Sequence, residues 1–323
     1  MRRISALLAL GAALAPGPAI SQTTLYPQKP VRVLVGLVPG GNPDVLARMV
    51  AAKLSETFGQ QFIVENRPGM SSGVAADVVA KSAPDGHAMF IGDSGVVTTN
   101  PHFYKNLPYD PFRDLTPVTL AVVVPMWLVV HPSLPVKSVK ELVALARSHK
   151  EPLLYASSGN GSIHHITTEA FKAATRIDMT HVPYRGAGQS VPAMLAGEVM
   201  VAFLGYPAMS GALKAGRLRV LAFSMARRSA LTPEVPTVAE TVAPGFDMSA
   251  PLGVFVAGGT RRDVVTRLNQ AVGTAIRSPD VAARMAAIGM EPAGLSPEQY
   301  EKNLREEHQR LGDLIRRIGL RLD

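Results

Sequence analysis

The stretch Val33-Leu-Val-Gly-Leu-Val-Pro-Gly-Gly-Asn-Pro-Asp44 decides the fold class of this chain. Its apolar first half predicts a buried strand, the glycine pair predicts a turn, and the residues over 44–57 follow a helical pattern. Asn42 is expected to be the N-cap of that helix. Gly40 and Gly41 leave backbone N–H groups bare at the positive end of the helix, so the turn predicts an anion-binding site without a charged side chain.

The same order of apolar strand, Gly/Ser-rich turn and helix recurs twice, with turns at 157–162 and 185–189. Alternating strands and helices predict an α/β fold, with mostly parallel sheets flanked by helices. Ligands of such sheets bind beyond the carboxyl ends of the strands, where these turns lie. Three turns of one design therefore indicate a ligand-binding cleft.

Prolines are frequent between residues 101 and 135, a pattern typical of extended segments that pass between domains. A helix–strand pattern fills the segment 128–246, and helical patterns return near the C-terminus. We therefore expect one domain that is split around another: a first lobe formed by 22–127 and 247–323, and a second lobe formed by 128–246.

The N-terminus predicts export. Arg2 and Arg3 precede an apolar run over 4–15, and a proline break and small residues follow, so residues 1–21 are interpreted as a secretory signal peptide. The protein is then periplasmic and soluble after cleavage. The sequence contains no cysteine, which excludes disulfides and thiolate metal sites.

Charge and motifs exclude several further classes. The formal net charge is +8, but the basic residues are scattered and no basic run is interleaved with aromatic residues, so nucleic acid is not an expected partner. Neither G-x-G-x-x-G nor G-x-x-x-x-G-K-[ST] occurs, and no cofactor is expected. His165 and Glu169 have the i, i+4 spacing of metal ligands but lack a third ligand, and we predict no metal site.

One alternative from another class is a secreted serine esterase. In Gly92-Asp93-Ser94-Gly95 a serine follows a predicted strand, as a catalytic nucleophile does. However, no G-x-S-x-G motif occurs, and no late Asp–His pair is present to serve as orienting group and base. We therefore expect no enzyme activity, and keep the esterase and a scaffold without ligand as alternatives.

Ten short motifs stand in an order that resembles a known family, the Bug receptors. These TctC-like proteins are the substrate-binding proteins of tripartite tricarboxylate transporters. The motifs include Tyr26-Pro-Gln-Lys-Pro-Val-Arg32, Pro39-Gly-Gly-Asn-Pro-Asp44, Val64-Glu-Asn-Arg-Pro-Gly69, Leu107-Pro-Tyr-Asp-Pro111 and His181-Val-Pro-Tyr-Arg-Gly186. The resemblance covers essentially the whole chain beyond residue 21.

The resemblance implies a two-lobed periplasmic binding protein of the type II, flytrap kind. Such a receptor, expected here as a monomer, captures a small carboxylate (an organic acid or an amino acid) and presents it to membrane permease subunits or to a sensor protein. The ligand-binding residues that we predict are Val38, Gly40, Gly41, Asn42, Asp44, Asp93, Ser94, Ser157, Asn160, Gly161, Ser162, His164, Arg185, Gly186, Ala187 and Tyr206.

Departures from the family pattern bear on the ligand. Leu37 and Val38 stand where the family usually has an aromatic residue and a proline, and Arg185 replaces the commoner lysine. Asp93 stands where a small or hydroxylated residue is usual, and we expect it either to face an ammonium or other donor on the ligand or to cap a turn away from the cleft. Gly205 replaces a polar residue, which predicts a larger pocket.

Overall fold

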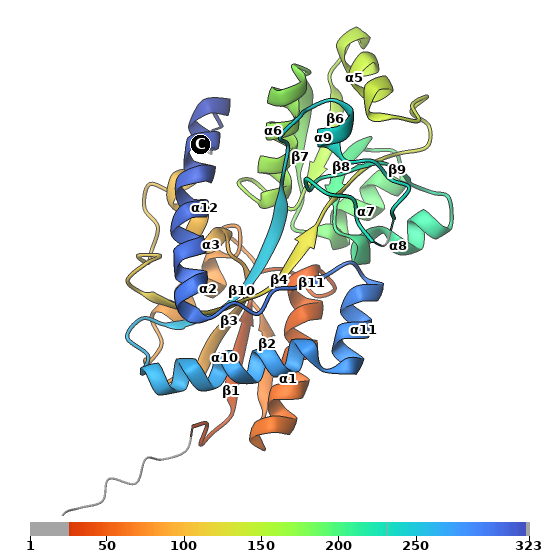
Figure 1. Cartoon of the computed structure of the whole chain (residues 1–323). Helices are drawn as coiled ribbons and strands as arrows, with labels where there is room; N and C mark the ends of the chain where they lie inside the picture. Colours follow the sequence, from red (N-terminus) through yellow and green to blue (C-terminus); the bar gives the residue numbers. More distant parts are fainter. Residues whose placement is uncertain (1–25, 231, 321–323) are drawn as a thin grey trace, which may run out of the picture.

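The computed structural model describes residues 26–230 and 232–320, which form two sheets with helices around them (Figure 1). The first sheet has six strands in the order β11-β4-β10-β3-β1-β2. Their bounds are β1 Val31–Val35, β2 Phe62–Asn66, β3 Ala88–Asp93, β4 Leu115–Pro125, β10 Ser249–Ala257 and β11 Glu291–Pro292. We call this sheet and its helices the first lobe.

The second sheet has five strands in the order β7-β6-β8-β5-β9. Their bounds are β5 Trp127–Val130, β6 Leu153–Ser157, β7 Met179–Pro183, β8 Val201–Leu204 and β9 Arg219–Phe223. We call this sheet and its helices the second lobe. In Figure 1 the two lobes stand one above the other, and the long strands β4 and β10 run between them.

Helices cover both sheets. Those of the first lobe are α1 Asn42–Phe58, α2 Gly73–Ala80, α3 Gly95–Thr98, α4 Asn100–Phe103, α10 Arg262–Arg277, α11 Pro279–Ala287 and α12 Pro297–Ile318. Those of the second lobe are α5 Val139–Ser148, α6 Ile163–Thr175, α7 Ala187–Leu195, α8 Tyr206–Lys214 and α9 Val238–Thr241. Because helices lie on both faces, the central strands are apolar throughout, and Val33, Leu34 and Phe90 are fully buried.

The two-lobed α/β class predicted from the sequence is confirmed, but the sheets are mixed rather than mostly parallel. Strand β1 is parallel to β2 and β3, whereas β10 lies antiparallel between β3 and β4. In the second sheet β6 is parallel to β7 and β8, and β5 is antiparallel to its neighbours β8 and β9. The reason is the path of the chain: β4 leads out of the first lobe and β10 returns to it, so they run in opposite directions.

The chain passes between the lobes at two places. It leaves the first sheet after β4 and enters the second sheet with β5, through Met126, and it returns between α9 and β10. The lobe boundaries given above remain a prediction. The predicted signal peptide, residues 1–21, lies outside the described residues. Among the described residues no helix is both long and apolar enough to span a bilayer.

Candidate functional site

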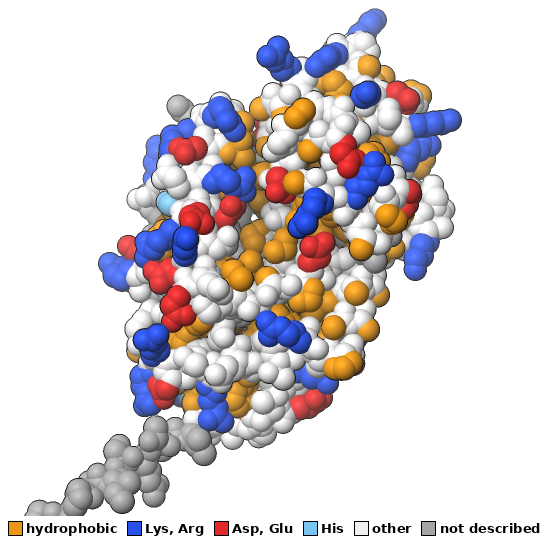
Figure 2. All heavy atoms as spheres, in the orientation of Figure 1, with side chains coloured by type: hydrophobic (Ala, Val, Ile, Leu, Met, Phe, Trp, Pro, Cys, Tyr) orange, Lys and Arg blue, Asp and Glu red, His pale blue; other side chains and the backbone are white. Residues whose placement is uncertain are grey.

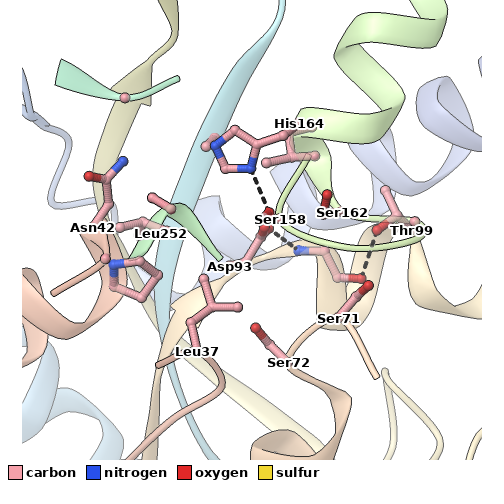
Figure 3. A pocket seen from close by; sticks show the side chains of 18 of the residues that line it. Leu37, Asn42, Ser71, Ser72, Asp93, Thr99, Ser158, Ser162, His164 and Leu252 are labelled. Carbon is pink, nitrogen blue, oxygen red and sulfur yellow. Dashed lines mark hydrogen bonds between the residues drawn. The ribbon is translucent and has the colours of Figure 1, made fainter. Parts of the chain in front are cut away.

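A pocket lies between the two lobes and is lined by residues of both (Figure 3). The first lobe contributes Leu37, Gly41, Asn42, Pro43, Ser71, Ser72, Asp93, Gly95, Thr99, Asn100, Ala250 and Leu252. The second lobe contributes Ser158, Gly161, Ser162, Ile163, His164, Ala187, Leu204, Gly205 and Ala208. The carboxyl ends of β3 and β8 therefore meet at one cavity, as expected for ligand sites in α/β folds.

Five helices of at least eight residues begin at this pocket: α1, α2, α6, α7 and α8. In each case the first helical residue or the one before it lines the cavity. These residues are Asn42, Ser72, Ser162, Ala187 and Gly205. Helix N-termini carry partial positive charge and N–H groups that have no partner within the helix. Among the described lining residues there is no Lys or Arg, so the groups available to attract an anion are backbone N–H groups and the neutral Ser, Thr and Asn side chains.

The α1 turn differs from the sequence-based expectation in two respects. The N-cap is Gly41, and Asn42 is already the first helical residue, so the prediction of Asn42 as N-cap is wrong by one position. Gly41 makes no side-chain cap, which leaves the helix end open toward the pocket. The N–H group of Gly40 donates to Asp44 Oδ2 at 3.0 Å, so this donor is already used inside the turn.

Asp44 holds the α1 turn in shape. It is 3% exposed and accepts hydrogen bonds from Arg48, at 2.9 and 3.0 Å, and from the side chain of Asn66, at 3.0 Å. Burial acts to raise the pKa of Asp44, but the hydrogen bonds from Arg48, Gly40 and Asn66 outweigh it and hold this pKa below its usual value. Asp44 is therefore an ionised carboxylate whose charge is balanced by Arg48 within the first lobe.

Asp93 lies at the end of β3 and lines the pocket. Its Oδ1 accepts a hydrogen bond from the N–H group of Gly95 at 2.8 Å, as Figure 3 shows. Burial raises the pKa of Asp93 to about 6, and the bond from Gly95 only partly opposes this effect.

The Ser/Gly-rich turn after β6 presents Ser158 rather than Ser157 to the pocket. Ser158 Oγ lies 2.7 Å from His164 Nδ1, and both side chains line the cavity (Figure 3). Burial lowers the pKa of His164 to about 4, so its ring is neutral at pH 7. Ser157 Oγ instead lies 2.6 Å from His181 Nε2, away from the cavity.

Two neighbouring residues fix the end of this turn. The N–H group of Gly161 donates to His165 Nδ1 at 3.1 Å, and Ser162 Oγ accepts from the N–H group of His165 as the N-cap of α6. Ring stacking on His181, with ring centroids 3.8 Å apart, holds the His165 ring in place. Burial lowers the pKa of His165 to about 4, which keeps Nδ1 free to accept.

The lobes touch across the mouth of the pocket. Ser71 lies in a turn where three successive residues, 70–72, have positive φ angles, and its Oγ donates to the carbonyl oxygen of Asn160 at 2.6 Å. Asn42 lies against Gly205, because a Cβ atom added to Gly205 would lie 2.2 Å from Asn42 Nδ2. These contacts join the first lobe to the second, as expected for a closed cleft. Gly205 thus makes room for Asn42 rather than for a larger ligand.

The structure brings together seven of the sixteen residues that the sequence pointed to. Those that line the pocket are Gly41, Asn42, Asp93, Gly161, Ser162, His164 and Ala187. Those outside the lining are Val38, Gly40, Asp44, Ser94, Ser157, Asn160, Arg185, Gly186 and Tyr206. Of these, Asn160 belongs to the contact between the lobes.

The remaining residues outside the lining have other contacts. A methyl group placed on Gly186 would lie 3.3 Å from Val38 Cγ2, so these two residues also meet where the lobes touch. Arg185 is exposed, and its N–H group donates to Gln189 Oε1. The ring of Tyr206 packs on Trp127, with centroids 5.5 Å apart.

Ser94 is a structural residue. It is 1% exposed, and its Oγ lies 2.6 Å from the hydroxyl of Tyr300 on α12. The burial of Ser94 and its contact with Tyr300 give no support to nucleophilic catalysis.

Within residues 26–230 and 232–320, no group of three His, Asp or Glu side chains has the geometry of a metal site.

Sequence reasoning missed more lining residues than it found. Most of them lie next to predicted positions or just after β3 and β8: Leu37, Pro43, Gly95, Thr99, Asn100, Ser158, Ile163, Leu204, Gly205 and Ala208. Two further sets lie in segments that no prediction covered. Ser71 and Ser72 lie in a turn whose positive φ angles are not encoded by glycine, so no motif marks it. Ala250 and Leu252 lie on β10, which the sequence analysis did not predict. The apolar run from Leu252 to Ala257 was the signal that could have found this strand.

The fold and the pocket define a two-lobed α/β solute-binding protein. The family model described as "Tripartite tricarboxylate transporter family receptor" matches residues 46–320. The chain therefore belongs to the tripartite tricarboxylate transporter receptor family, as its resemblance to the Bug receptors predicted. Members of this family are solute-binding receptors rather than enzymes, so the esterase interpretation is wrong.

Individual relatives agree over nearly the whole chain. Protein BugT of Bordetella pertussis is 32% identical over 323 residues, which cover 100% of this chain and 99% of BugT. The structure described as "R. palustris Rpa4515 with adipate" has a TM-score of 0.88 and 36% identity, and the match covers 92% of this chain and 100% of that one. The structure of MatC from Rhodopseudomonas palustris with bound malate has a TM-score of 0.84 and 30% identity, over 90% and 100% of the two chains.

Proposed function

We propose that this protein is an extracytoplasmic receptor that captures a small carboxylate between its lobes. The observation that carries this proposal is the convergence of five helix N-termini on a pocket with no Lys or Arg among its described lining residues. Such a pocket binds a carboxylate through backbone N–H groups. The adipate and malate bound to Rpa4515 and MatC are carboxylates and support the same ligand class.

Binding is coupled to closure of the lobes. The ligand contacts residues of both lobes, while Ser71 and Asn160, and Asn42 and Gly205, meet only when the lobes are together. A ligand that makes more contacts in the closed form than in the open form shifts the population toward the closed form. The closed form is then the form that a permease or a sensor protein recognises.

The surface and the N-terminus fit this role. Lys and Arg side chains are spread over both lobes on the face in Figure 2, with Asp and Glu among them, and form no continuous basic band there. We propose export through the signal peptide 1–21, a periplasmic location and a monomeric state. Mass spectrometry of the protein purified from the periplasmic fraction tests the cleavage, and light scattering after size-exclusion chromatography tests the monomer.

The test of the receptor function is a binding screen. Thermal shift with a panel of small mono- and dicarboxylates and amino acids is expected to raise Tm with at least one of them, because a ligand that binds only the native state stabilises it. The hit is then titrated by calorimetry. A protein that binds none of the panel at millimolar concentration would contradict the proposal.

A matched pair of variants tests the role of the helix ends. Ser162→Ala removes the N-cap of α6 at the pocket, and Ser138→Ala removes the same kind of cap from α5, whose N-cap lies outside the pocket lining. Each variant is expected to lose about 1 kcal/mol of stability. Only Ser162→Ala is expected to weaken ligand binding, by about threefold or more. Equal affinities of the two variants would contradict a role of the α6 terminus in binding.

A further inference from the structure

The pocket contains an acidic side chain, which repels an anionic ligand. Asp93 and His164 are the only ionisable side chains among the described lining residues, and His164 is neutral at pH 7. Asp93 is therefore the one charged side chain there at pH 8. Its Oδ1 accepts a hydrogen bond from the N–H group of Gly95. Among the described lining residues no cationic side chain balances the charge of the carboxylate.

A carboxylate ligand alone would add a second negative charge to this cleft. At a separation of about 4 Å, two such charges repel by about 4 kcal/mol at an effective dielectric constant of 20. A positive nitrogen on the ligand removes this conflict, because it pairs with Asp93 while the ligand carboxylate binds elsewhere at the helix N-termini. Asn42 Oδ1 and Asn100 Oδ1 are buried acceptors in the lining without a hydrogen-bond partner among the described residues, so a donor on the ligand finds further acceptors beside Asp93.

We infer that the ligand carries, besides its carboxylate, a positively charged amino group that pairs with Asp93, so that the captured solute is a small zwitterion. The inference rests on the proposed function, since it requires the carboxylate to bind in the same pocket. In this arrangement Asp93 binds the amino group of the ligand, and the backbone N–H groups bind its carboxylate.

The walls of the pocket fit the part of the ligand between these ends. Leu37, Ile163, Leu204 and Leu252 line the cavity with apolar surface, as Figure 3 shows for Leu37 and Leu252. An aliphatic segment buried against such side chains gains about 25 cal/mol for each Å² of apolar surface. The ligand class that results is an amino acid with a short aliphatic body.

The experiment compares ligands that differ only at the far end. 6-Aminohexanoate, hexanoate and adipate share a six-carbon chain and end in an ammonium, a methyl group and a carboxylate; 4-aminobutyrate, butyrate and succinate form a shorter set, and α-amino acids complete the panel. Calorimetry at pH 8, where Asp93 is ionised, is expected to give the tightest binding for an ammonium-bearing member, at least tenfold tighter than its methyl and carboxylate counterparts.

Asp93→Asn provides the matching change in the protein, because the amide is isosteric and its Oδ1 still accepts from Gly95. It is expected to weaken the ammonium-bearing ligand by 10- to 100-fold, to leave the methyl-ended ligand within about threefold, and to strengthen the dicarboxylate. Glu151→Gln, which removes the same charge from an exposed position outside the pocket, is the control and is expected to change none of these affinities.

Two results would overturn the inference while leaving the receptor function intact. One is a methyl- or carboxylate-ended ligand that binds at least as tightly as its ammonium counterpart. The other is an ammonium preference that survives in Asp93→Asn. If no member of the panel binds the wild type or either variant, the proposed function itself fails, and the inference fails with it.

Discussion

Gly205→Ala is expected to weaken ligand binding by hindering closure of the lobes. The φ angle of Gly205 is −73°, so alanine fits the backbone there without strain. Its Cβ atom would lie 2.2 Å from Asn42 Nδ2 of the other lobe, about 1.2 Å inside an ordinary contact of about 3.4 Å. Asn42 must therefore turn away or the cleft must stay partly open. Overpacking of this kind costs about 1–3 kcal/mol, which corresponds to about 5- to 150-fold in affinity.

A control in the same helix separates closure from helix stability. Gly211 is exposed within α8, and a Cβ atom added there has no neighbour within 4 Å. Gly211→Ala is expected to raise stability by about 0.5–1 kcal/mol, since glycine inside a helix is unfavourable, and to leave the affinity unchanged.

A double-mutant cycle identifies the source of the effect. Asn42→Ala removes the side chain that Cβ of residue 205 would meet, so Gly205→Ala is expected to cost less than about 0.5 kcal/mol of binding energy in that background. Calorimetry gives the affinities, and small-angle scattering gives the change in radius of gyration on binding. An equal loss in both backgrounds, or no loss in the single variant Gly205→Ala, would refute the steric reasoning.

Three further changes test other parts of the structure. Ser71→Ala removes the hydrogen bond from Ser71 to Asn160 of the other lobe, and is expected to weaken ligand binding by about 2- to 10-fold through faster dissociation. The control Ser82→Ala removes a hydrogen bond within the first lobe and is expected to leave the affinity unchanged. Asp44→Asn is expected to cost about 1.5–3 kcal/mol of stability at pH 7. Because folding lowers the pKa of Asp44, this loss of stability is fully present above about pH 4 and becomes smaller on further acidification. Urea unfolding at several pH values measures it. The pKa of Asp93 is raised by folding, to about 6, so its ionised form destabilises the native state above that pH. Asp93→Asn is therefore expected to be more stable than the ligand-free wild type by about 2–3 kcal/mol at pH 8, and the gain is expected to vanish below about pH 4; a gain that is the same at both pH values would contradict burial of this charge.

The turns that follow strands were the most predictable part of the site. Small residues after an apolar run mark the predicted turns 40–44, 157–162 and 185–189, and each turn leads into a helix that begins at the pocket. These features depend on local backbone chemistry, which a short stretch of sequence encodes.

Which side chain of a turn faces the ligand was less predictable. Ser157 and Ser158 are neighbours, and only the pairing of Ser157 with His181 on the adjacent strand turns Ser158 to the pocket. Asp44 was expected at the ligand, although Arg48 one helical turn later already indicated its partner. Contacts between distant segments, such as Gly205 with Asn42, depend on how the lobes approach each other, and no local pattern encodes them.

The direction of the strands also required the tertiary structure. Strand–helix alternation correctly indicated parallel pairing of β1 with β2 and β3, but the antiparallel insertion of β10 follows from the return of the chain from the second lobe. Such long-range pairing has no signal in sequence spacing.

The central claim is that backbone N–H groups at helix N-termini bind the carboxylate of the ligand. A crystal structure with the tightest carboxylate from the binding screen tests it directly. We expect the carboxylate oxygens within about 3.2 Å of backbone nitrogens at the starts of α1, α6 or α7, inside the pocket that Asn42, Ser162 and Ala187 line. A carboxylate that is instead paired with a Lys or Arg side chain, or bound outside this pocket, would contradict the account.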